Sequence, residues 1–320
     1  MEKIPPRVSI ITPSYNQAAY LEQTIQSVLG QGYPNLEYII VDGGSTDGSV
    51  EIIQKYAGRL AWWVSEKDNG QAESVNKGFR RATGDFVGWL NSDDLYLPGA
   101  IAGAVSALQA HPQVGFVFSD VDSIDAAGNR INIMRFGDWG LLDLMCFRII
   151  SEPGVFMRRS LLEQAGYLDL AYHYLLDHQL WLRLGLLAQI KHVQGVRWAA
   201  ARFHPAAKNV AHAASFGGEA YRIVEWMLTT PEFQPFLAGM QRKVRAGAHR
   251  LDAFYLLDGG QPGAALKAYW KGLLQYAPAV LPDWYRILYA LLSPLGLKKL
   301  REGYLRRRAR RLNHEPNDRS

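Results

Sequence analysis

The sequence contains a single cysteine, Cys146, among 320 residues. One cysteine cannot form an intrachain disulfide, and no cluster of Cys and His has the spacing of a zinc site. A chain without disulfides or structural zinc is typical of a reducing compartment, so we expect a cytoplasmic protein. The first residues also lack the charged-then-apolar pattern of a secretory signal.

Long apolar runs are missing as well. Crossing a bilayer takes roughly 20 apolar residues. The best candidate, Ile287–Leu297, is short, is flanked by Arg286 and Lys298, and contains Pro294. We therefore expect no transmembrane helix. Hydrophobic residues make up 48% of the chain and charged residues 20%, which is the composition of a folded globular protein and argues against a disordered one.

An excess of positive charge is absent from most of the chain, although the net charge is +5. Residues 298–312 carry eight basic residues and one acid, a local charge of +7, and 5 − 7 leaves −2 for the remainder. We therefore expect no nucleic-acid partner. The basic tail is either a solvated helix or, with the apolar stripe from Trp284 to Leu295, an anchor on the anionic inner face of a membrane.

The first 120 residues alternate β-branched apolar runs with segments of helical spacing. This alternation predicts an α/β fold, with a mostly parallel sheet and helices on both faces. Strands are expected at 7–12, 36–41, 61–64, 85–90 and 114–118, and helices at 19–31, 49–56, 71–81 and 98–109.

The rest of the chain changes character twice. Residues 120–205 are less regular, with a turn at 125–129 and an amphipathic helix at 177–187. After residue 206 the spacing is helical throughout, and 246–278 predicts a helical hairpin with its turn at 259–262. We therefore predict a catalytic domain over 1–205, followed by a helical C-terminal region with a basic tail over 206–320.

Polar segments follow three of the predicted strands: Thr12–Asn16, Asp42–Gly48 and Asn91–Asp94. In an open α/β sheet, ligands bind beyond the carboxyl ends of the strands. The adjacent carboxylates of Asp93 and Asp94 repel each other unless a cation or hydrogen-bond donors compensate. The glycine loops that bind phosphate are absent. A divalent cation held by carboxylates and phosphate oxygens is therefore expected to handle a bound diphosphate.

Four stretches resemble, in order, the motifs of family 2 glycosyltransferases with the GT-A fold. They are VSIITPSYNQAAYLEQTIQSVLGQGYPNLEYIIVDGGSTDGS, EKDNGQAESVNKG, ATGDFVGWLNSDD and LLDHQLWLRLG, and the resemblance covers about residues 7–205. It implies an inverting, non-processive enzyme that uses Mg²⁺ or Mn²⁺. Such an enzyme moves a sugar from a nucleoside diphosphate sugar to a sugar or lipid-linked acceptor, in cell-surface polysaccharide or glycolipid synthesis.

The resemblance also implies which residues bind the donor. The loop after the first strand would line the nucleobase and ribose, a carboxylate would accept from the base, and another would touch the ribose. Two polar residues would lie beside the donor. These residues are, in that order, Thr12, Pro13 and Tyr15, then Asp42, then Asp93, and finally Gln71 and Asn76.

For metal and catalysis, the resemblance implies Asp94 as a metal ligand and Asp177 as the general base. His204 would be a third metal ligand or a diphosphate contact. Two positions depart from the family pattern. Leu176 stands where a glutamate usually precedes the base, and Ser92 occupies the first position of the acidic motif.

Each assignment has a structural alternative. Asp93 and Asp94 could form a solvated turn, Asp42 could cap a tight turn, and Asp177 could be a helix N-cap. A lone histidine such as His204 is more often structural than a ligand. Gln194–Trp198 matches the Q-x-x-R-W string of processive synthases, but those enzymes extrude polymer through membrane spans. We favour a structural interpretation of this string.

Two other functions are compatible with the pattern. A nucleotide-sugar-binding or scaffold protein could keep the fold without turnover, and Leu176 is the one hint of it. A nucleotidyltransferase also uses a metal-bound diphosphate, but it would need a glycine-rich basic loop after the first strand. The segment TPSYNQ is not such a loop.

Overall fold

The computed structural model describes residues 4–293. Contacts divide the chain into two compact units, each described here by itself. Unit 1 contains the described residues up to Ile124, together with 136–141 and 149–202. Unit 2 contains 125–135, 142–148 and the described residues from Phe203 onward.

The sheet of unit 1 has the strand order β3-β2-β1-β4-β8-β6-β9-β5. Strands β3, β2, β1 and β4 are parallel to one another, and β6 and β9 are also parallel. Strand β8 is antiparallel to both neighbours, and β5 is antiparallel to β9. The strands are β1 (Val8–Ser14), β2 (Leu36–Asp42), β3 (Trp62–Ser65), β4 (Phe86–Trp89), β5 (Leu95–Tyr96), β6 (Val114–Ile124), β8 (Val155–Arg158) and β9 (Gln189–Arg202).

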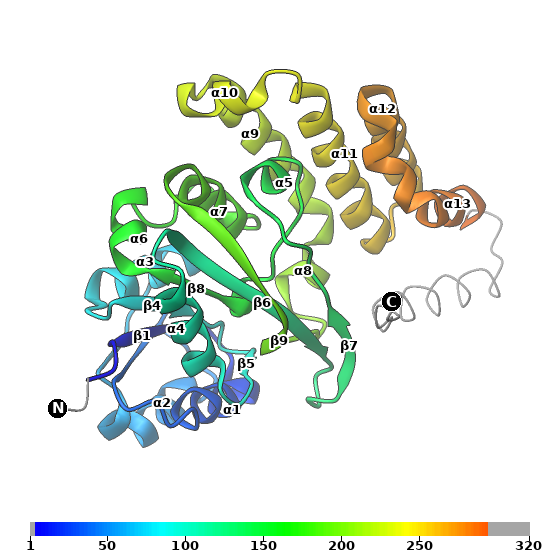
Figure 1. Cartoon of the computed structure of the whole chain (residues 1–320). Helices are drawn as coiled ribbons and strands as arrows, with labels where there is room; N and C mark the ends of the chain where they lie inside the picture. The colour runs from blue at the N-terminus through cyan, green and yellow to red at the C-terminus, as the bar shows by residue number, and fades with distance from the viewer. Residues whose placement is uncertain (1–3, 294–320) are drawn as a thin grey trace. The chain divides into compact units, whose positions relative to one another are not determined.

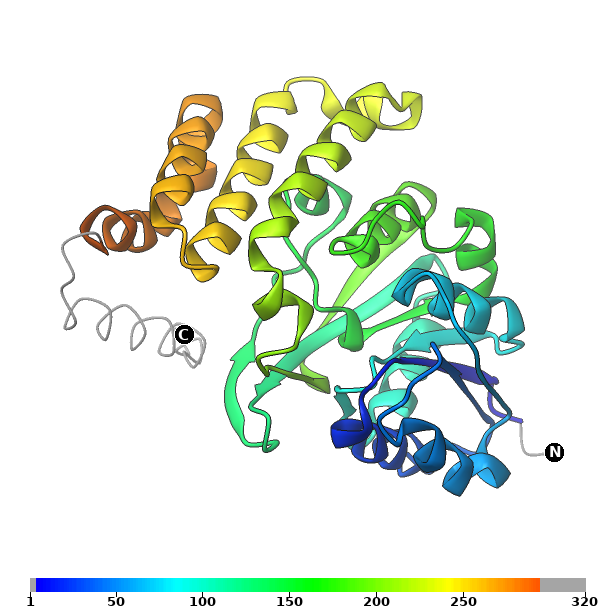
Figure 2. The same ribbon diagram turned by 180° about the vertical axis from the view of Figure 1, so that it is seen from behind.

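Helices cover both faces of this sheet, as the sequence predicted. Helix α4 lies in front of the sheet in Figure 1, and the reverse view in Figure 2 brings α3 and α7 to the front. Helix α3 lies so close to β1 that a Cβ at Gly78 would come within 2.5 Å of Ile11 Cγ2, and glycine at this position permits the approach. The helices are α1 (Ala18–Leu29), α2 (Ser49–Tyr56), α3 (Gln71–Arg81), α4 (Ala100–Ala110), α6 (Arg159–Ala165) and α7 (Leu176–Leu187), with short 3-10 turns η1 (Ala57–Arg59) and η2 (Glu152–Gly154).

Unit 2 is mainly helical, which confirms the prediction for the region after residue 206. Helices α9, α11 and α12 lie side by side, and α13 packs on α12 (Figure 1). The predicted helical hairpin corresponds to α11 and α12. The elements are β7 (Arg130–Met134), α5 (Leu141–Met145, whose first residue belongs to unit 1), α8 (Lys208–Ala211), η3 (Ala213–Ser215), α9 (Phe216–Thr229), η4 (Pro231–Phe233), α10 (Gln234–Leu237), α11 (Gln241–Asp258), α12 (Pro262–Val280), η5 (Leu281–Asp283) and α13 (Trp284–Leu292).

Among residues 4–293, no helix combines the length and apolar character needed to span a membrane.

Several element boundaries differ from the sequence prediction. The strand expected at 114–118 continues to Ile124, and the helix expected from Pro98 begins at Ala100. Strands β5, β8 and β9 were not predicted. The expected turn at 125–129 is present. Its Gly128 amide donates to the Asp125 carbonyl at 3.0 Å.

Candidate active site

The three polar segments lie at the carboxyl ends of neighbouring parallel strands, as predicted. Ser14 and Asp42 are register partners at the ends of β1 and β2. The Gly43 amide donates to the Ser14 carbonyl at 2.8 Å, and the Leu90 amide after β4 donates to Ile11 at 2.9 Å. The chain therefore brings these loops to one edge of the sheet, where an α/β fold binds ligands.

The turn after β4 is held from two distant parts of the chain. The Thr24 hydroxyl of α1 lies 2.9 Å from the Ser92 carbonyl and 2.8 Å from the Asp94 carbonyl. Arg202, the last residue of β9, donates its Nε to the Asp93 carbonyl and its amide to Asp94 Oδ1, both at 2.8 Å. The sequence analysis identified neither Thr24 nor Arg202, because only the fold brings them to this turn.

The Asp94 carboxyl is buried, in contrast to a solvated turn. Burial, and then the neighbouring charge of Asp93, hold the pKa of Asp94 well above its ordinary value. A cation would relieve both effects, so Asp94 fits a metal ligand. Within residues 4–293, no three His, Cys, Asp or Glu side chains form a ready-made metal site. A diphosphate would therefore have to supply part of the ligand set, as it does in many magnesium sites.

A side-chain network missed by the sequence analysis lies beside this turn. Asn91 Oδ1 accepts from Gln71 Nε2 at 2.6 Å and from Trp89 Nε1 at 2.9 Å. Asn91 Nδ2 donates to Glu152 Oε2 at 2.8 Å. Glu152 lies on η2, which directly precedes β8. Its only sequence signal is an acid before a proline, so nothing in the sequence indicated that it meets Asn91.

Glu152 is only 6% exposed, and among the described residues 4–293 its Oε1 atom has no hydrogen-bond partner. Burial raises the pKa of Glu152 well above its ordinary value, and the charges of Asp94, Asp177 and Asp93 raise it further, in that order. Each of these carboxylates is thus near enough to be felt electrostatically at Glu152. Four acidic side chains from three separate segments converge at this edge.

Asp177 is the second residue of α7, whose N-cap is Leu175. It is therefore inside the first helical turn rather than at the cap, and its carboxyl is half-buried. Its neighbour Leu176 is buried in the core. Deeper in the helix, Trp181 packs against Phe116 with ring centroids 5.4 Å apart. This packing fixes the helix that carries the proposed base.

The residues expected to bind the donor occupy very different environments. Tyr15 is 63% exposed. Thr12 is fully buried, and its hydroxyl accepts from Tyr38 at 3.1 Å. Pro13 is also buried. Asn76 exchanges hydrogen bonds of 2.8 and 2.9 Å with the Leu168 backbone, so its amide ties α3 to the segment before α7.

The Asp42 carboxyl is buried and already satisfied by its own loop. Its Oδ2 accepts from the amides of Gly44 and Ser45 and from the Ser65 hydroxyl, at 3.1, 2.9 and 2.7 Å. Its Oδ1 accepts from the Ser45 hydroxyl at 2.5 Å. In this structure, therefore, Asp42 shapes the loop after β2, which agrees with the turn-cap alternative.

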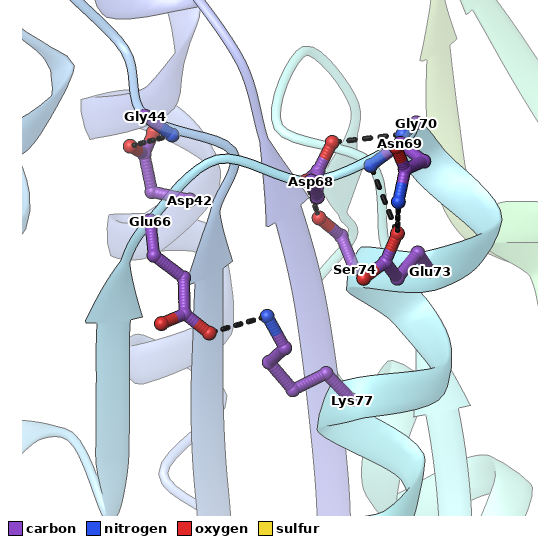
Figure 3. Close-up of polar contacts among 9 residues, drawn as sticks. All are labelled: Asp42, Gly44, Glu66, Asp68, Asn69, Gly70, Glu73, Ser74 and Lys77. Atoms are coloured by element: carbon purple, nitrogen blue, oxygen red, sulfur yellow. Dashed lines mark hydrogen bonds and ion pairs between the residues drawn. The ribbon is translucent and has the colours of Figure 1, made fainter.

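The loop between β3 and α3 is fixed to α3 by its own polar side chains (Figure 3). Asp68 accepts from the Gly70 amide at 2.9 Å and from the Ser74 hydroxyl. Asn69 donates to Glu73 at 2.7 Å. Asp68 also approaches the Asp42 loop, since a Cβ at Gly43 would lie 2.7 Å from its Oδ2. The two loops thus form one continuous rim.

Two other candidates remain, His204 and the Q-x-x-R-W string. His204 is buried in unit 2, beyond the end of β9. In the Q-x-x-R-W string, Arg197 of β9 pairs with Asp122 of β6 at 2.8 Å, and Trp198 is buried. Sheet pairing and core packing account for these two residues, in agreement with the structural interpretation.

Comparison with known proteins identifies the family. The model for glycosyl transferase family 2 matches residues 9–162. The uncharacterized glycosyltransferase MT1564 of Mycobacterium tuberculosis is 30% identical over 192 residues, which cover 58% of this chain and 71% of that protein. The chain belongs to glycosyl transferase family 2.

Two other proteins are similar over shorter stretches. The putative teichuronic acid biosynthesis glycosyltransferase TuaG of Bacillus subtilis is 47% identical over 92 residues, which cover 28% of this chain and 36% of TuaG. The O-antigen biosynthesis protein RfbC of Myxococcus xanthus is 30% identical over 184 residues, 56% of this chain but 14% of RfbC. The matched segment is thus a minor part of these two relatives.

Solved structures share the fold. Residues 1–349 of S. aureus TarS give a TM-score of 0.62 at 18% identity, covering 91% of this chain and 92% of that one. The mannosyltransferase PcManGT from Pyrobaculum calidifontis, solved with GDP-Man and Mn²⁺, gives 0.59 at 22% identity, covering 95% and 85%. TarS 1–349 was also solved with UDP-GlcNAc. The predicted GT-A fold is therefore confirmed, and the family 2 chain continues into an all-helical region.

Two buried glutamates of this family 2 chain are predicted to respond in opposite ways to the same Glu→Gln substitution. Because the pKa of Glu152 is raised on folding, its stabilising contribution is present at low pH and is lost as the pH rises. Glu152→Gln should therefore raise the Tm of the metal-free protein at pH 7. The shift should be roughly 2–4 °C for each kcal/mol gained, and the gain should disappear near pH 4.

Glu37 provides the matched control. Burial alone would raise the pKa of Glu37, but hydrogen bonds from Ser9 and Thr83 together outweigh it and lower that pKa. Its contribution is present above the ordinary glutamate pKa and is lost as the pH falls. Glu37→Gln should therefore lower Tm at pH 7, and less so at pH 4. Thermal unfolding from pH 4 to 8 measures both variants, and shifts of the same sign at pH 7 would contradict the assignment.

Proposed function

We propose that this chain transfers a sugar, with inversion, from a nucleoside diphosphate sugar to an acceptor hydroxyl. The proposal rests on the buried Asp94 in the turn after β4 and on Asp177 at the start of α7, whose charges both raise the pKa of Glu152. A diphosphate-binding carboxylate and a general base near each other are what a single displacement requires. The names of RfbC and TuaG support a role in cell-surface polysaccharide or glycolipid synthesis.

We assign the catalytic domain to residues 1–205 and the helical C-terminal region to 206–320. The donor nucleotide would lie on the rim formed by the loops after β1, β2 and β3. Tyr15 is exposed there and can cover a base or ribose. We retain Asp93 as the ribose contact and Gln71 as a neighbour of the donor. Thr12, Pro13, Asp42 and Asn76 would act by shaping this rim, because their side chains are buried.

Asp94 would hold Mg²⁺ or Mn²⁺, with His204 as a further candidate ligand, and the cation would neutralise the departing diphosphate. Asp177 would take the proton of the acceptor hydroxyl as its oxygen attacks the anomeric carbon. The half-buried position of Asp177 suits this role, because an acceptor arriving from solvent can reach it. The acceptor would be a sugar or a lipid-linked sugar.

Asp94→Asn tests the metal assignment. Asparagine keeps an oxygen for the Arg202 amide, so the turn should remain folded. Release of nucleoside diphosphate from a panel of UDP- and GDP-sugars with Mn²⁺ or Mg²⁺ should fall at least about 10²-fold, because a cation supplies several kcal/mol of charge stabilisation. Asp85→Asn, which changes a carboxylate on the amino side of β4, should retain activity. Near-parental activity of Asp94→Asn would refute the assignment.

Asp177→Asn tests the base. The variant should bind donor with unchanged affinity but transfer at least roughly 10²-fold more slowly, the loss expected for a positioned general base. Asp169→Asn is a matched control, since Asp169 is an exposed acid in the segment before α7. Single-turnover transfer and donor titration separate the two effects. Equal transfer rates for Asp177→Asn and the parent would remove Asp177 from the reaction.

We further propose that the C-terminal region binds an anionic membrane surface. Helix α13 has two different faces. Arg286 and Ala290 are buried, and Arg286 pairs with Asp258 of α11 at 2.7 Å. Trp284, Leu288 and Leu291 share an exposed face. Leu295 and the basic tail at 298–312 lie outside the described residues. An exposed apolar face followed in sequence by basic residues is suited to an anionic lipid interface.

Replacing Trp284, Leu288 and Leu291 together by alanine tests this proposal without removing the Arg286 ion pair. The parent should float with vesicles of phosphatidylcholine and phosphatidylserine at low salt and less so at high salt. The triple variant should stay in the soluble fraction. Leu170→Ala, an exposed leucine in unit 1, should float like the parent. A parent protein that does not float at low salt would refute membrane binding.

A further inference from the structure

Glu152 is a buried acid that the proposed proton transfer does not use. Its Oε2 atom is held by Asn91 at 2.8 Å, and Asn91 is in turn fixed by Gln71 and Trp89. The other carboxyl oxygen, Oε1, is buried and finds no hydrogen-bond partner in the part of the chain that the structure describes. The carboxyl group is therefore held in place at one end and has an unused hydrogen-bonding position at the other.

A structural role does not explain the unused oxygen. Glu37 shows what a structural buried glutamate looks like in this chain. Its Oε2 accepts from the Ser9 hydroxyl and the Thr83 amide, and its Oε1 accepts from the Thr83 hydroxyl and contacts Arg7. Buried polar atoms without a partner are rare in folded proteins because each costs free energy. Several such atoms occur in residues 4–293, for example Ser14 Oγ and Trp181 Nε1, but Glu152 Oε1 belongs to a carboxyl that is affected by the charges of Asp94 and Asp177. At that place a partner can arrive with the substrate.

The metal ion is assigned above to Asp94 and the diphosphate, and the acceptor proton is a poor candidate for the partner of Glu152 Oε1. A general base must exchange its proton with solvent, and Glu152 is nearly inaccessible, whereas Asp177 is half-buried. The remaining ligand at this edge is the sugar that passes between the diphosphate site at Asp94 and the base at Asp177.

We propose that Glu152 Oε1 hydrogen-bonds a hydroxyl of the sugar being transferred, and that Glu152 thereby determines which donor sugar the enzyme accepts. This inference rests on the proposed glycosyl transfer. A hydroxyl group suits the position because it can donate to a carboxylate or accept from a protonated carboxyl. A site built to bond a hydroxyl also rejects analogues that lack it, since its own polar group is then left unpaired.

The decisive measurement compares two ligands on each variant, in the full chain with Mn²⁺. Nucleoside diphosphate alone lacks the sugar, whereas the matching nucleotide sugar carries it. The parent is titrated calorimetrically with UDP and GDP, and with UDP-GlcNAc, UDP-glucose and GDP-mannose. For the sugar that binds, Glu152→Ala should weaken nucleotide-sugar affinity by about 10- to 100-fold, the range for a hydrogen bond to a carboxylate. Its affinity for the diphosphate alone should change less than about twofold.

Two further variants make the result specific. Glu152→Gln retains the shape and an oxygen for Asn91, so it should recover part of the lost affinity and remains informative if Glu152→Ala does not fold. Glu37→Gln makes the same change at the amino end of β2, and it should leave both affinities unchanged. Donors that each lack one hydroxyl identify the bonded group. For the donor that lacks the bonded hydroxyl, Glu152→Ala should cause no loss of affinity.

Three outcomes would overturn the inference. Equal loss for diphosphate and nucleotide sugar in both Glu152 variants would mean that Glu152 supports the phosphate site. Unchanged nucleotide-sugar affinity in both variants would mean that the sugar does not contact Glu152, while the proposed function stands. A parent protein that binds none of the nucleotide sugars would instead refute the proposed function, and the inference with it.

Discussion

The turn at the end of β4 must hold two adjacent carboxylates against their mutual repulsion, and much of unit 1 is arranged around that requirement. Backbone carbonyls of the turn accept from Thr24 of α1 and from Arg202 of β9. Arg202 is itself held by Gln23 at 2.9 Å and lies over the Tyr20 ring, with its guanidinium carbon 4.8 Å from the ring centroid. One buried guanidinium thus joins the first helix, the acidic turn and the last long strand.

Two buried carboxyls, one in this turn and one beside it, lower the stability of the folded chain. Asp94 and Glu152 both have a raised pKa because they are buried with too few charge-stabilising partners. Glu37 is also buried, but hydrogen bonds from Ser9 and Thr83 and the charge of Arg7 outweigh the effect of burial on its pKa. Natural proteins commonly accept such a cost where a group must bind a ligand. The contrast separates a carboxyl that holds the sheet together from the two carboxyls that we propose bind a cation or a substrate.

The sequence predicted the parts of the fold that depend on local pattern. Strands β1 and β2 are continuous β-branched runs and are buried along almost their whole length, so their positions were evident. Strand β9 was missed because its alternation is interrupted. Gly195 has a positive φ of 73°, and the pairing with β6 shifts register near Asp120. A strand that changes register does not keep a regular alternation of apolar and polar residues, so the sequence pattern does not predict it.

For the candidate site, the sequence predicted the position of the loops but not the contacts of their side chains. Motif order indicated the loops at the sheet edge, and these loops do converge there. What the motifs did not reveal is which side chains are available to a ligand. Asn76 belongs to a recognisable motif, yet its amide is occupied by the Leu168 backbone. Glu152 belongs to no motif that we recognised and becomes noticeable only through Asn91, 61 positions earlier in the chain.

Packing in α7 also accounts for Leu176, the one sequence feature that hinted at a scaffold protein without turnover. Leu176 stands where the family usually has a glutamate, immediately before the proposed base. Successive residues of a helix point about 100° apart, so neighbours at 176 and 177 cannot both face the site in the same way. Leu176 is buried with the core of unit 1, whereas Asp177 is half-buried and acts electrostatically on Glu152. The leucine is therefore explained by packing, and its presence leaves the carboxylates of the site intact.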